Sequence, residues 1–225
     1  MSSIDIHRRV RVAARALGRH GLTGAWGHCS ARIDENSFLV CPPQPMGTVA
    51  IGAKGTVVPI NAPLPQGVLG EVRIHQKIYA KSPHIGGVCR VMPPITMALS
   101  TLGETPIPRH GVGAFVSDCQ FWDDPRLLRD DDLAKQLVDV LGEASAIVMR
   151  ANGAVTVGES LEVAAGIAWC LEDTAKIDQI VRSMSHDKPK GLSLEEIASR
   201  QITTGGVFER LWSYLSFGDE ESYQL

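Results

Sequence analysis

Short apolar runs alternate with helix-like segments along this chain, and that alternation constrains its fold more than any other feature. Apolar residues recur at helical spacing in three early and central segments, 5–20, 70–82 and 132–142. Apolar, β-branched runs predict strands at 37–41 and 85–92, and a strand–turn–strand pattern spans 145–158. Because this alternation favours an α/β fold and a hairpin adds an antiparallel pair, we expect helices around a central mixed sheet.

The remaining segments complete this predicted order. Residues 160–184 form the clearest helical pattern, with Ser160 as its N-cap, and further helices are predicted at 94–102, 194–201 and 205–215. The glycine-rich segment 21–33 is expected to be a loop, and 42–67 to hold loops and short strands. The polar joint 185–193 and the last residues, 218–225, carry no such pattern, and the latter are expected to fray.

Length and charge bound the class of protein. A chain of 225 residues, 44% hydrophobic and 21% charged, fits one globular domain spanning residues 1–225. The net charge of −3 gives no electrostatic footprint for nucleic acid or an anionic membrane. No apolar run approaches the roughly 20 residues that cross a bilayer, and the N-terminal segment lacks a signal-peptide core. We therefore expect a cytoplasmic protein.

The cysteines form no recognisable pairing pattern. There are five, scattered and without a CxxC pair, so neither a disulfide framework nor a thiolate zinc site is predicted. Most should be small buried hydrophobes. Cys29 is the exception, because it lies in the glycine-rich segment 21–33.

Three segments together resemble the class II aldolase/adducin family. They are the glycine-rich residues 21–33, the stretch 70–94 with Glu71 opening a helix and a strand ending in Pro-Pro, and residues 150–164, which begin RANG. The resemblance covers nearly the whole chain in the family's order. It implies a three-layer α/β/α domain around a mixed sheet, and a cyclic homotetramer with active sites between subunits.

The same resemblance implies a divalent metal held by three histidines, with a glutamate as acid/base, and here this chain departs from the family. The family's H-x-H pair falls on Arg90 and Met92, and its third histidine falls on Asn152, whereas the glutamate is retained as Glu71. A guanidinium cannot ligate a dication, a thioether suits soft metals, and an amide is a weak ligand. We therefore predict that the family's metal is absent and that no cofactor replaces it.

The family's phosphate-binding positions are also changed. They read Ala25, Pro43 and Gln44, and Leu69 and Gly70 in this chain, where proline has no N–H and leucine no hydroxyl. The substrate is therefore expected to lack a phosphate. Residues 27–32 (GHCSAR), 63–75 (PLPQGVLGEVRIH) and 122–125 (WDDP) resemble the branch that decarboxylates hydroxylated pyridine and benzene dicarboxylates. That branch keeps metal ligands that this chain lacks.

Three residues are the candidate catalytic groups. Arg90 can orient a substrate carboxylate or stabilise an enolate, or it can simply pair with a buried acid. Glu71 can be a general acid/base or a substrate anchor, although a glutamate at a helix N-terminus is also favoured by the dipole; a salt bridge to Arg90 is a further possibility. His28 can move a proton near neutral pH, or be structural.

Further residues are candidates for substrate binding. Cys29 and Ser30 flank His28 in the glycine-rich segment, and His75 lies one helical turn after Glu71, where a hydrogen bond supporting the site is its expected role. The others are His110 in a turn, Asn152, which either binds substrate or takes a left-handed turn position, and Tyr214, which either reaches a neighbouring subunit's site or packs with Trp212.

The predicted function is a metal-independent lyase of decarboxylase type, acting on a small aromatic or cyclic hydroxy acid. Arg90 would orient the carboxylate while Glu71 and His28 move protons. Two alternatives stay open at this point: a cyclase, isomerase or dehydratase on the same scaffold, and a non-catalytic, adducin-like binding subunit.

Overall fold

The computed structural model describes residues 5–184 and 189–223. Its helices are α1 (Ile6–Arg19), α2 (Arg73–Lys81), α3 (Pro94–Ser100), α4 (Asp131–Leu141), α5 (Leu161–Met184), α6 (Leu194–Arg200) and α7 (Val207–Ser216). Its strands are β1 (His28–Arg32), β2 (Ser37–Val40), β3 (Thr56–Pro59), β4 (Gly87–Val91), β5 (Gln120–Trp122), β6 (Ala146–Met149) and β7 (Ala154–Gly158). Short 3-10 turns lie at Met46–Thr48, Gly70–Val72 and Gly111–Val116.

The strands form one mixed sheet, as predicted, in the order β3-β2-β1-β4-β7-β6-β5. All its neighbouring pairs are antiparallel except β5 and β6, which run parallel. The predicted hairpin at 145–158 is confirmed as the β6–β7 pair, and β7 also pairs with β4. This pairing brings the C-terminal end of β4 beside the turn that joins β6 to β7.

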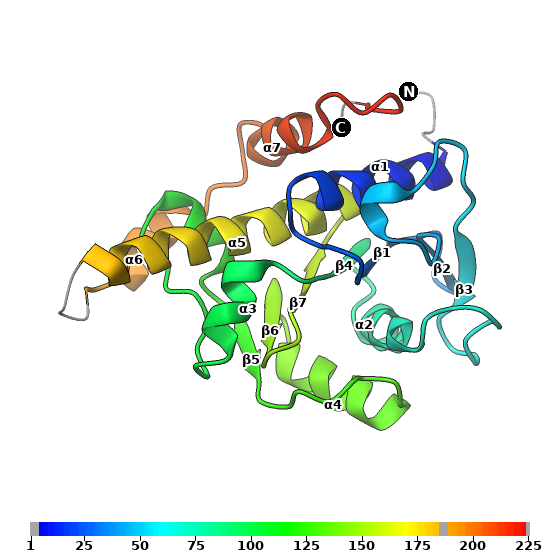
Figure 1. The fold of residues 1–225 in the computed structure, drawn as a ribbon, viewed down its shortest axis with the longest axis horizontal. Helices are drawn as coiled ribbons and strands as arrows, with labels where there is room; N and C mark the ends of the chain where they lie inside the picture. Colours follow the sequence, from blue (N-terminus) through cyan, green and yellow to red (C-terminus); the bar gives the residue numbers. More distant parts are fainter. Residues whose placement is uncertain (1–4, 185–188, 224–225) are drawn as a thin grey trace.

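Helices cover both faces of the sheet (Figure 1). On one face α1 packs against β1, where the Cys29 Sγ atom lies 3.8 Å from the Val10 carbonyl oxygen. On the other face the Tyr79 ring of α2 packs 4.8 Å from the Phe38 ring of β2, measured between ring centroids. Helix α5 approaches β4 at Gly87, where a Cβ atom would lie 2.3 Å from the Leu161 Cα atom. The close contact of α5 with the sheet therefore requires glycine at this position.

The segment 21–33 differs from its prediction as a loop. Residues 28–32 form β1, an interior strand that pairs with β2 on one side and β4 on the other. Its sequence, HCSAR, has little of the apolar, β-branched character that marks a strand. Hydrogen bonds to two neighbouring strands, which are distant in sequence, override this weak local preference.

The end of the chain also differs from its prediction as frayed. The Asp219 carboxylate is buried and accepts hydrogen bonds from Arg15 at 2.7 and 2.8 Å, and Glu221 accepts from Arg11 at 2.5 and 2.8 Å. Residues 219–223 are therefore attached to the polar side of α1. Residues 224 and 225, and residues 185–188 of the predicted joint, lie outside the described residues.

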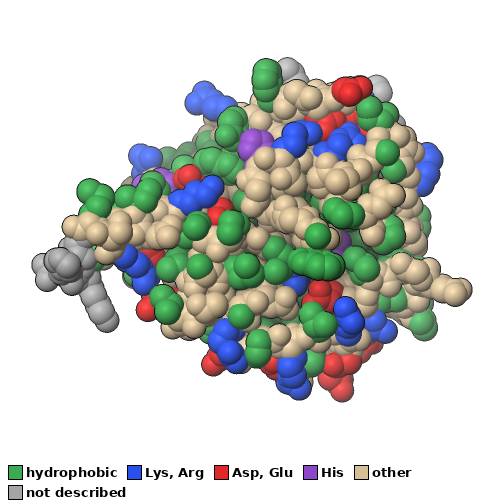
Figure 2. Space-filling view, viewed as in Figure 1, with side chains coloured by type: hydrophobic (Ala, Val, Ile, Leu, Met, Phe, Trp, Pro, Cys, Tyr) green, Lys and Arg blue, Asp and Glu red, His purple; other side chains and the backbone are tan. Residues whose placement is uncertain are grey.

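The surface in Figure 2 intersperses lysine and arginine with aspartate and glutamate over the face that is shown. Among the described residues, no helix combines the length and apolar character needed to span a bilayer. The homotetramer that the family resemblance implies stays a prediction.

Candidate active site

The candidate residues gather at one end of the sheet, where four chain segments meet. His28 begins β1 and lies directly opposite Arg90, near the end of β4. Asn152 belongs to the turn between β6 and β7, and Glu71 lies in the 3-10 turn that leads into α2. Because side chains of directly opposed residues share a face of the sheet, His28 and Arg90 project to the same side, toward α2.

Arg90 is held between an amide and a carboxylate. Its Nη2 atom donates a hydrogen bond of 2.7 Å to the Asn152 Oδ1 atom and lies 3.5 Å from the Glu71 Oε2 atom. The Arg90 side chain is only 3% exposed and that of Glu71 16%. Burial lowers the pKa of Arg90 and the Glu71 carboxylate opposes this effect; a guanidinium remains protonated throughout the range in which proteins are folded. The salt bridge considered from the sequence is therefore present.

The predicted turn at Asn152 is present, and of the two alternatives for this residue the left-handed position is excluded. Ala151 and Gly153, not Asn152, take the left-handed conformation, with φ of 55° and 73°. The Ala151 N–H donates to the Ser100 Oγ atom at 2.9 Å, and the Met149 N–H donates to the Gly153 carbonyl at 2.8 Å. Asn152 is thus free of the left-handed position, and its side chain points to Arg90 instead.

A second polar group continues from His28 into the interior. The His28 Nδ1 atom lies 2.8 Å from the His75 Nε2 atom, and the His75 Nδ1 atom lies 2.6 Å from the Ser30 Oγ atom. The Ser30 Oγ atom lies 2.9 Å from the Tyr79 hydroxyl, which donates to the Ser30 carbonyl oxygen at 3.0 Å. The predicted supporting hydrogen bond of His75 is thus one member of a buried chain of four side chains.

The two imidazoles of this hydrogen-bonded group, those of His28 and His75, are neutral at physiological pH. Burial lowers the pKa of His75 to about 3, and the positive charge of Arg90 acts in the same direction. Burial, followed by His75 and Arg90, lowers the pKa of His28 well below its ordinary value. A buried, uncharged His28 is therefore a hydrogen-bonding group and a weaker base than an exposed imidazole.

Five buried polar atoms of the site have no hydrogen-bond partner among the described residues. They are His28 Nε2, Glu71 Oε1, Arg90 Nε and Nη1, and Asn152 Nδ2. Buried polar atoms are normally paired, so such a group at one end of a sheet indicates a place where a ligand binds. The Arg90 and Asn152 nitrogens are donors and the Glu71 oxygen is an acceptor when ionised, so the set suits a ligand with both an anionic group and a hydroxyl.

Cys29 is not part of this group, although it lies between His28 and Ser30 in the sequence. Successive side chains of a strand point to opposite faces, and Cys29 points toward α1. It is fully buried beside Cys41, and its Sγ atom contacts the Val10 carbonyl oxygen. Within one subunit, the position of Cys29 therefore does not support its predicted contact with the substrate.

His110 and Tyr214 also lie apart from the Arg90 group. The His110 Nε2 atom lies within hydrogen-bond distance, 2.9 Å, of the Asp173 Oδ2 atom of α5. Tyr214 is 56% exposed on α7, and its ring lies near those of His20 and Trp169, not near Trp212. Trp212 packs with Tyr223 instead. Within one chain the structure brings together Glu71, Arg90, His28, Ser30, His75 and Asn152.

Tyr79 is the site residue that the sequence analysis missed. It occupies an apolar position of the predicted helix 70–82, yet its hydroxyl is part of the buried chain. The signal was available, because Glu71, His75 and Tyr79 are spaced four residues apart and so lie on one side of a helix.

The residues at the family's metal positions do not fit a divalent cation. Arg90 brings a fixed positive charge, and the Asn152 oxygen already accepts a hydrogen bond from it. Met92 offers only a thioether, close to Gly153. Within residues 5–184 and 189–223, no three His, Cys, Asp or Glu side chains are grouped so that they could hold a metal ion.

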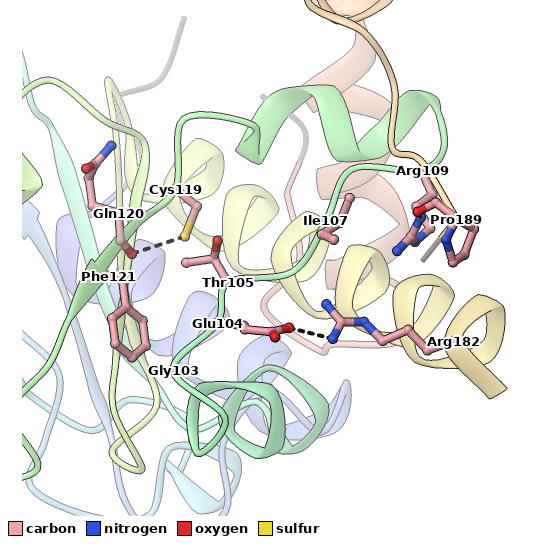
Figure 3. A pocket seen from close by; sticks show the side chains of 10 residues that line it. All are labelled: Gly103, Glu104, Thr105, Ile107, Arg109, Cys119, Gln120, Phe121, Arg182 and Pro189. Atoms are coloured by element: carbon pink, nitrogen blue, oxygen red, sulfur yellow. Dashed lines mark hydrogen bonds and ion pairs between the residues drawn. The ribbon is translucent and has the colours of Figure 1, made fainter. Parts of the chain in front are cut away.

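A separate cavity of about 530 Å³ lies on another part of the molecule (Figure 3). Its charged residues are already paired: Arg182 contacts Glu104 at 2.5 Å and Asp178 at 2.9 Å, and Arg109 contacts Asp178 at 2.7 Å. None of the residues grouped around Arg90 lines it.

Comparisons with known proteins decide the family. The model of the class II aldolase and adducin N-terminal domain matches residues 8–178. The chain belongs to this family. It is 28% identical to a 3,4-dihydroxyphthalate decarboxylase from Arthrobacter keyseri over 219 residues, which cover 88% of this chain and 78% of that protein.

Solved structures confirm the class II aldolase fold of this family member. An L-fuculose 1-phosphate aldolase from Glaciozyma antarctica superposes with a TM-score of 0.77 at 17% identity, over 94% of this chain and 86% of that one. An aldolase II superfamily protein from Pseudomonas syringae gives a TM-score of 0.72 at 24% identity, over 94% and 92% of the two chains. At these identities the likeness establishes the fold alone.

Proposed function

We propose that this protein is a metal-independent lyase that decarboxylates a small, non-phosphorylated aromatic or cyclic hydroxy acid. The observation that carries the proposal is Arg90, buried at the position of a family metal ligand, with its Nε and Nη1 atoms without partners. The 28% identity to a 3,4-dihydroxyphthalate decarboxylase supports the reaction type.

The polar atoms of the site suit the recognition of a hydroxy acid. The Nε and Nη1 atoms of Arg90 and the Nδ2 atom of Asn152 can donate hydrogen bonds to a carboxylate. The Glu71 Oε1 atom can accept one from a ligand hydroxyl. Because Arg90 carries a permanent positive charge, it also stabilises negative charge that develops on the ligand, a task that the dication performs elsewhere in the family.

The proposed reaction needs only proton transfers and one bond cleavage. Glu71 takes the proton of a hydroxyl ortho to the carboxylate and delivers it to the ring carbon that bears the carboxylate, giving a cyclohexadienone. The carbon–carbon bond then breaks, and its electron pair returns to the ring, which becomes a phenolate as carbon dioxide leaves. A proton from solvent converts the phenolate to the phenol product.

A substrate panel tests this reaction. Hydroxylated phthalates, benzoates and pyridine carboxylates are incubated with the enzyme, and carbon dioxide release is measured. In deuterium oxide we expect one deuterium in the product at the carbon that lost the carboxylate. If no compound is turned over and none raises the melting temperature, the decarboxylase proposal fails and the non-catalytic, adducin-like interpretation replaces it.

The variant Arg90→Lys tests the role of the guanidinium. Lysine keeps the charge but has a single ammonium group, which cannot both hold Asn152 and present further donors to a carboxylate. We expect kcat/KM to fall about 100-fold or more, as when one donor to a developing negative charge is removed. The matched control is Arg150→Lys, because Arg150 pairs with Asp123 at the surface. Turnover of Arg90→Lys at the wild-type rate would contradict the assignment.

A further inference from the structure

The hydrogen bonds that link the four buried side chains are all donated in the same direction along the chain, and the Tyr79 hydroxyl fixes that direction. The Tyr79 hydroxyl carries one hydrogen and lies within hydrogen-bond distance of both the Ser30 carbonyl oxygen and the Ser30 Oγ atom. A carbonyl can only accept, so the phenol hydrogen is donated there. The Ser30 hydroxyl is then the donor to the phenol oxygen.

The Ser30 hydroxyl in turn fixes which nitrogen of each imidazole carries the hydrogen. The Ser30 hydroxyl hydrogen is already donated to Tyr79, so the His75 Nδ1 atom, 2.6 Å from the Ser30 Oγ atom, must be the donor of that contact. A neutral imidazole carries one N–H, so the His75 Nε2 atom is bare, meaning that it carries no hydrogen, and it accepts a hydrogen bond from the His28 Nδ1 atom at 2.8 Å. By the same rule, the His28 Nε2 atom is bare.

The reversed chain is less favourable. It would need the Tyr79 hydroxyl to donate to the Ser30 Oγ atom, so the hydrogen bond to the Ser30 carbonyl oxygen would be lost. It would also place the single N–H of His28 on its Nε2 atom, on the face of the sheet that it shares with the positive charge of Arg90. Both effects favour a lone pair at the His28 Nε2 atom.

We propose that Tyr79, Ser30 and His75 are positioning residues that fix His28 as the tautomer with a bare Nε2 atom, so that His28 selects ligands with a hydroxyl in addition to the one that Glu71 deprotonates. The Nε2 atom is buried and has no partner among the described residues. A bare nitrogen accepts a hydrogen bond from a hydroxyl but repels a methoxy oxygen or a second carboxylate. The choice of ligand rests on the proposed function, whereas the tautomer is a property of the free protein.

The tautomer is measured directly by nitrogen-15 NMR of the intact protein with labelled histidine at pH 7. A protonated ring nitrogen and a bare one have well-separated chemical shifts, and the signals of the seven histidines are assigned with single His→Gln variants. We expect His28 and His75 each to show a protonated Nδ1 and a bare Nε2. A protonated Nε2 on His28, or a charged ring, would overturn the proposal.

The variant Tyr79→Phe tests the origin of the direction. It keeps the ring that packs on Phe38 and under the Arg32 guanidinium, and it removes only the hydroxyl. Ser30 can then donate to His75, so we expect signals of the reversed tautomers to appear at both histidines. Tyr223→Phe is the matched control, because it removes a half-buried phenol that donates to Glu162 and should leave both histidines unchanged. Unchanged tautomers in Tyr79→Phe would contradict the role of the phenol.

Ligand binding separates this inference from the proposed function. With a substrate found in the panel, wild type should bind the hydroxy acid at least about tenfold more tightly than its methyl ether, a difference of roughly 1.4 kcal/mol, and Tyr79→Phe should lose most of that preference. Equal preference in the two proteins would refute the selective role. The predicted tautomers without any turnover would overturn the decarboxylase proposal alone, and turnover with the opposite tautomer would overturn only the present inference.

Discussion

Asn152 shows at the scale of one residue how the site balances charge and access. Its Oδ1 atom satisfies one nitrogen of Arg90 without neutralising the guanidinium, and its Nδ2 atom remains a donor. A carboxylate at this position would instead pair with the charge. A neutral amide therefore leaves the attraction of Arg90 available to a ligand carboxylate.

The variant Asn152→Asp tests this balance. The new carboxylate should form an ion pair with Arg90 and compete with the ligand, so we expect KM for a hydroxy acid substrate to rise about tenfold or more, the equivalent of roughly 1.4 kcal/mol. The melting temperature should stay the same or rise, because the buried Arg90 gains a second counter-charge in addition to that of Glu71. Steady-state kinetics and thermal unfolding check both effects. An unchanged KM would show that the ligand does not bind at Arg90.

The sequence predicted most members of the site but not which of them meet. Glu71, Arg90 and Asn152 came from motifs in register, and they do lie together. Cys29 was predicted beside them because 28–32 was taken as a loop; the alternation of a strand separates it from His28 and Ser30. Ala151 adopts the left-handed conformation in the turn, and its N–H donates to Ser100, a residue distant in sequence; local preferences cannot predict such a contact.

At the scale of elements, the attachment of residues 219–223 to α1 is the feature least visible in the sequence. Arginines at 8, 11, 15 and 19 lie along one side of α1, and all four contact the terminal segment. Taken alone, the segment is short, polar and without periodicity, so local preferences predict fraying. Its order comes from the buried ion pairs of Arg15 with Asp219 and Glu221.

The variant Glu221→Gln tests the contribution of this attachment to stability. Hydrogen bonds from Arg11, followed by those from Arg15, lower the pKa of Glu221 from 4.5 to about 2. Since the folded pKa lies below the unfolded one, the stabilisation is fully present above pH 4.5 and is lost as the pH falls toward 2. We expect wild type to exceed Glu221→Gln in unfolding free energy by about 1–3 kcal/mol at pH 7, with the difference shrinking below pH 4.5.

Urea unfolding of both proteins at several pH values measures this difference. The matched control is Glu220→Gln, because Glu220 is the exposed neighbour in the same segment. It should stay within about 0.5 kcal/mol of wild type at every pH. A pH-independent gap between wild type and Glu221→Gln would show that the loss comes from packing and not from the ionised carboxylate.

At the scale of the whole molecule, the sheet order creates the site. β1 and β4 are separated by more than fifty residues, yet their pairing sets His28 opposite Arg90, and the β4–β7 pair brings the turn with Asn152 alongside. The helices and the β6–β7 hairpin follow from local periodicity and were predicted. The strand neighbours are non-local, and only the family resemblance indicated that these segments meet.

The fold also places together the three positions at which the family resemblance implies metal ligands. Arg90 and Met92 lie two residues apart on β4 and just beyond its end, Asn152 contacts Arg90, and a Cβ atom on Gly153 would lie 2.9 Å from the Met92 Sδ atom. The three positions at which the family resemblance implies metal ligands therefore converge in this structure. Replacing the three residues by histidine should then create a metal site beside Glu71.

The triple variant Arg90→His, Met92→His, Asn152→His tests whether ligand identity alone accounts for the predicted metal independence. Wild type purified without chelator should hold far less than one metal ion per chain by elemental analysis, and zinc should leave its melting temperature unchanged. The triple variant should bind about one zinc per chain and melt at a higher temperature when zinc is added, because binding to the folded state alone stabilises it. The double variant without Asn152→His, which lacks one ligand, should respond less. Stoichiometric zinc or manganese in wild type would overturn the metal-free mechanism, whereas a triple variant that folds but ignores zinc would show that the three positions no longer converge as a ligand set.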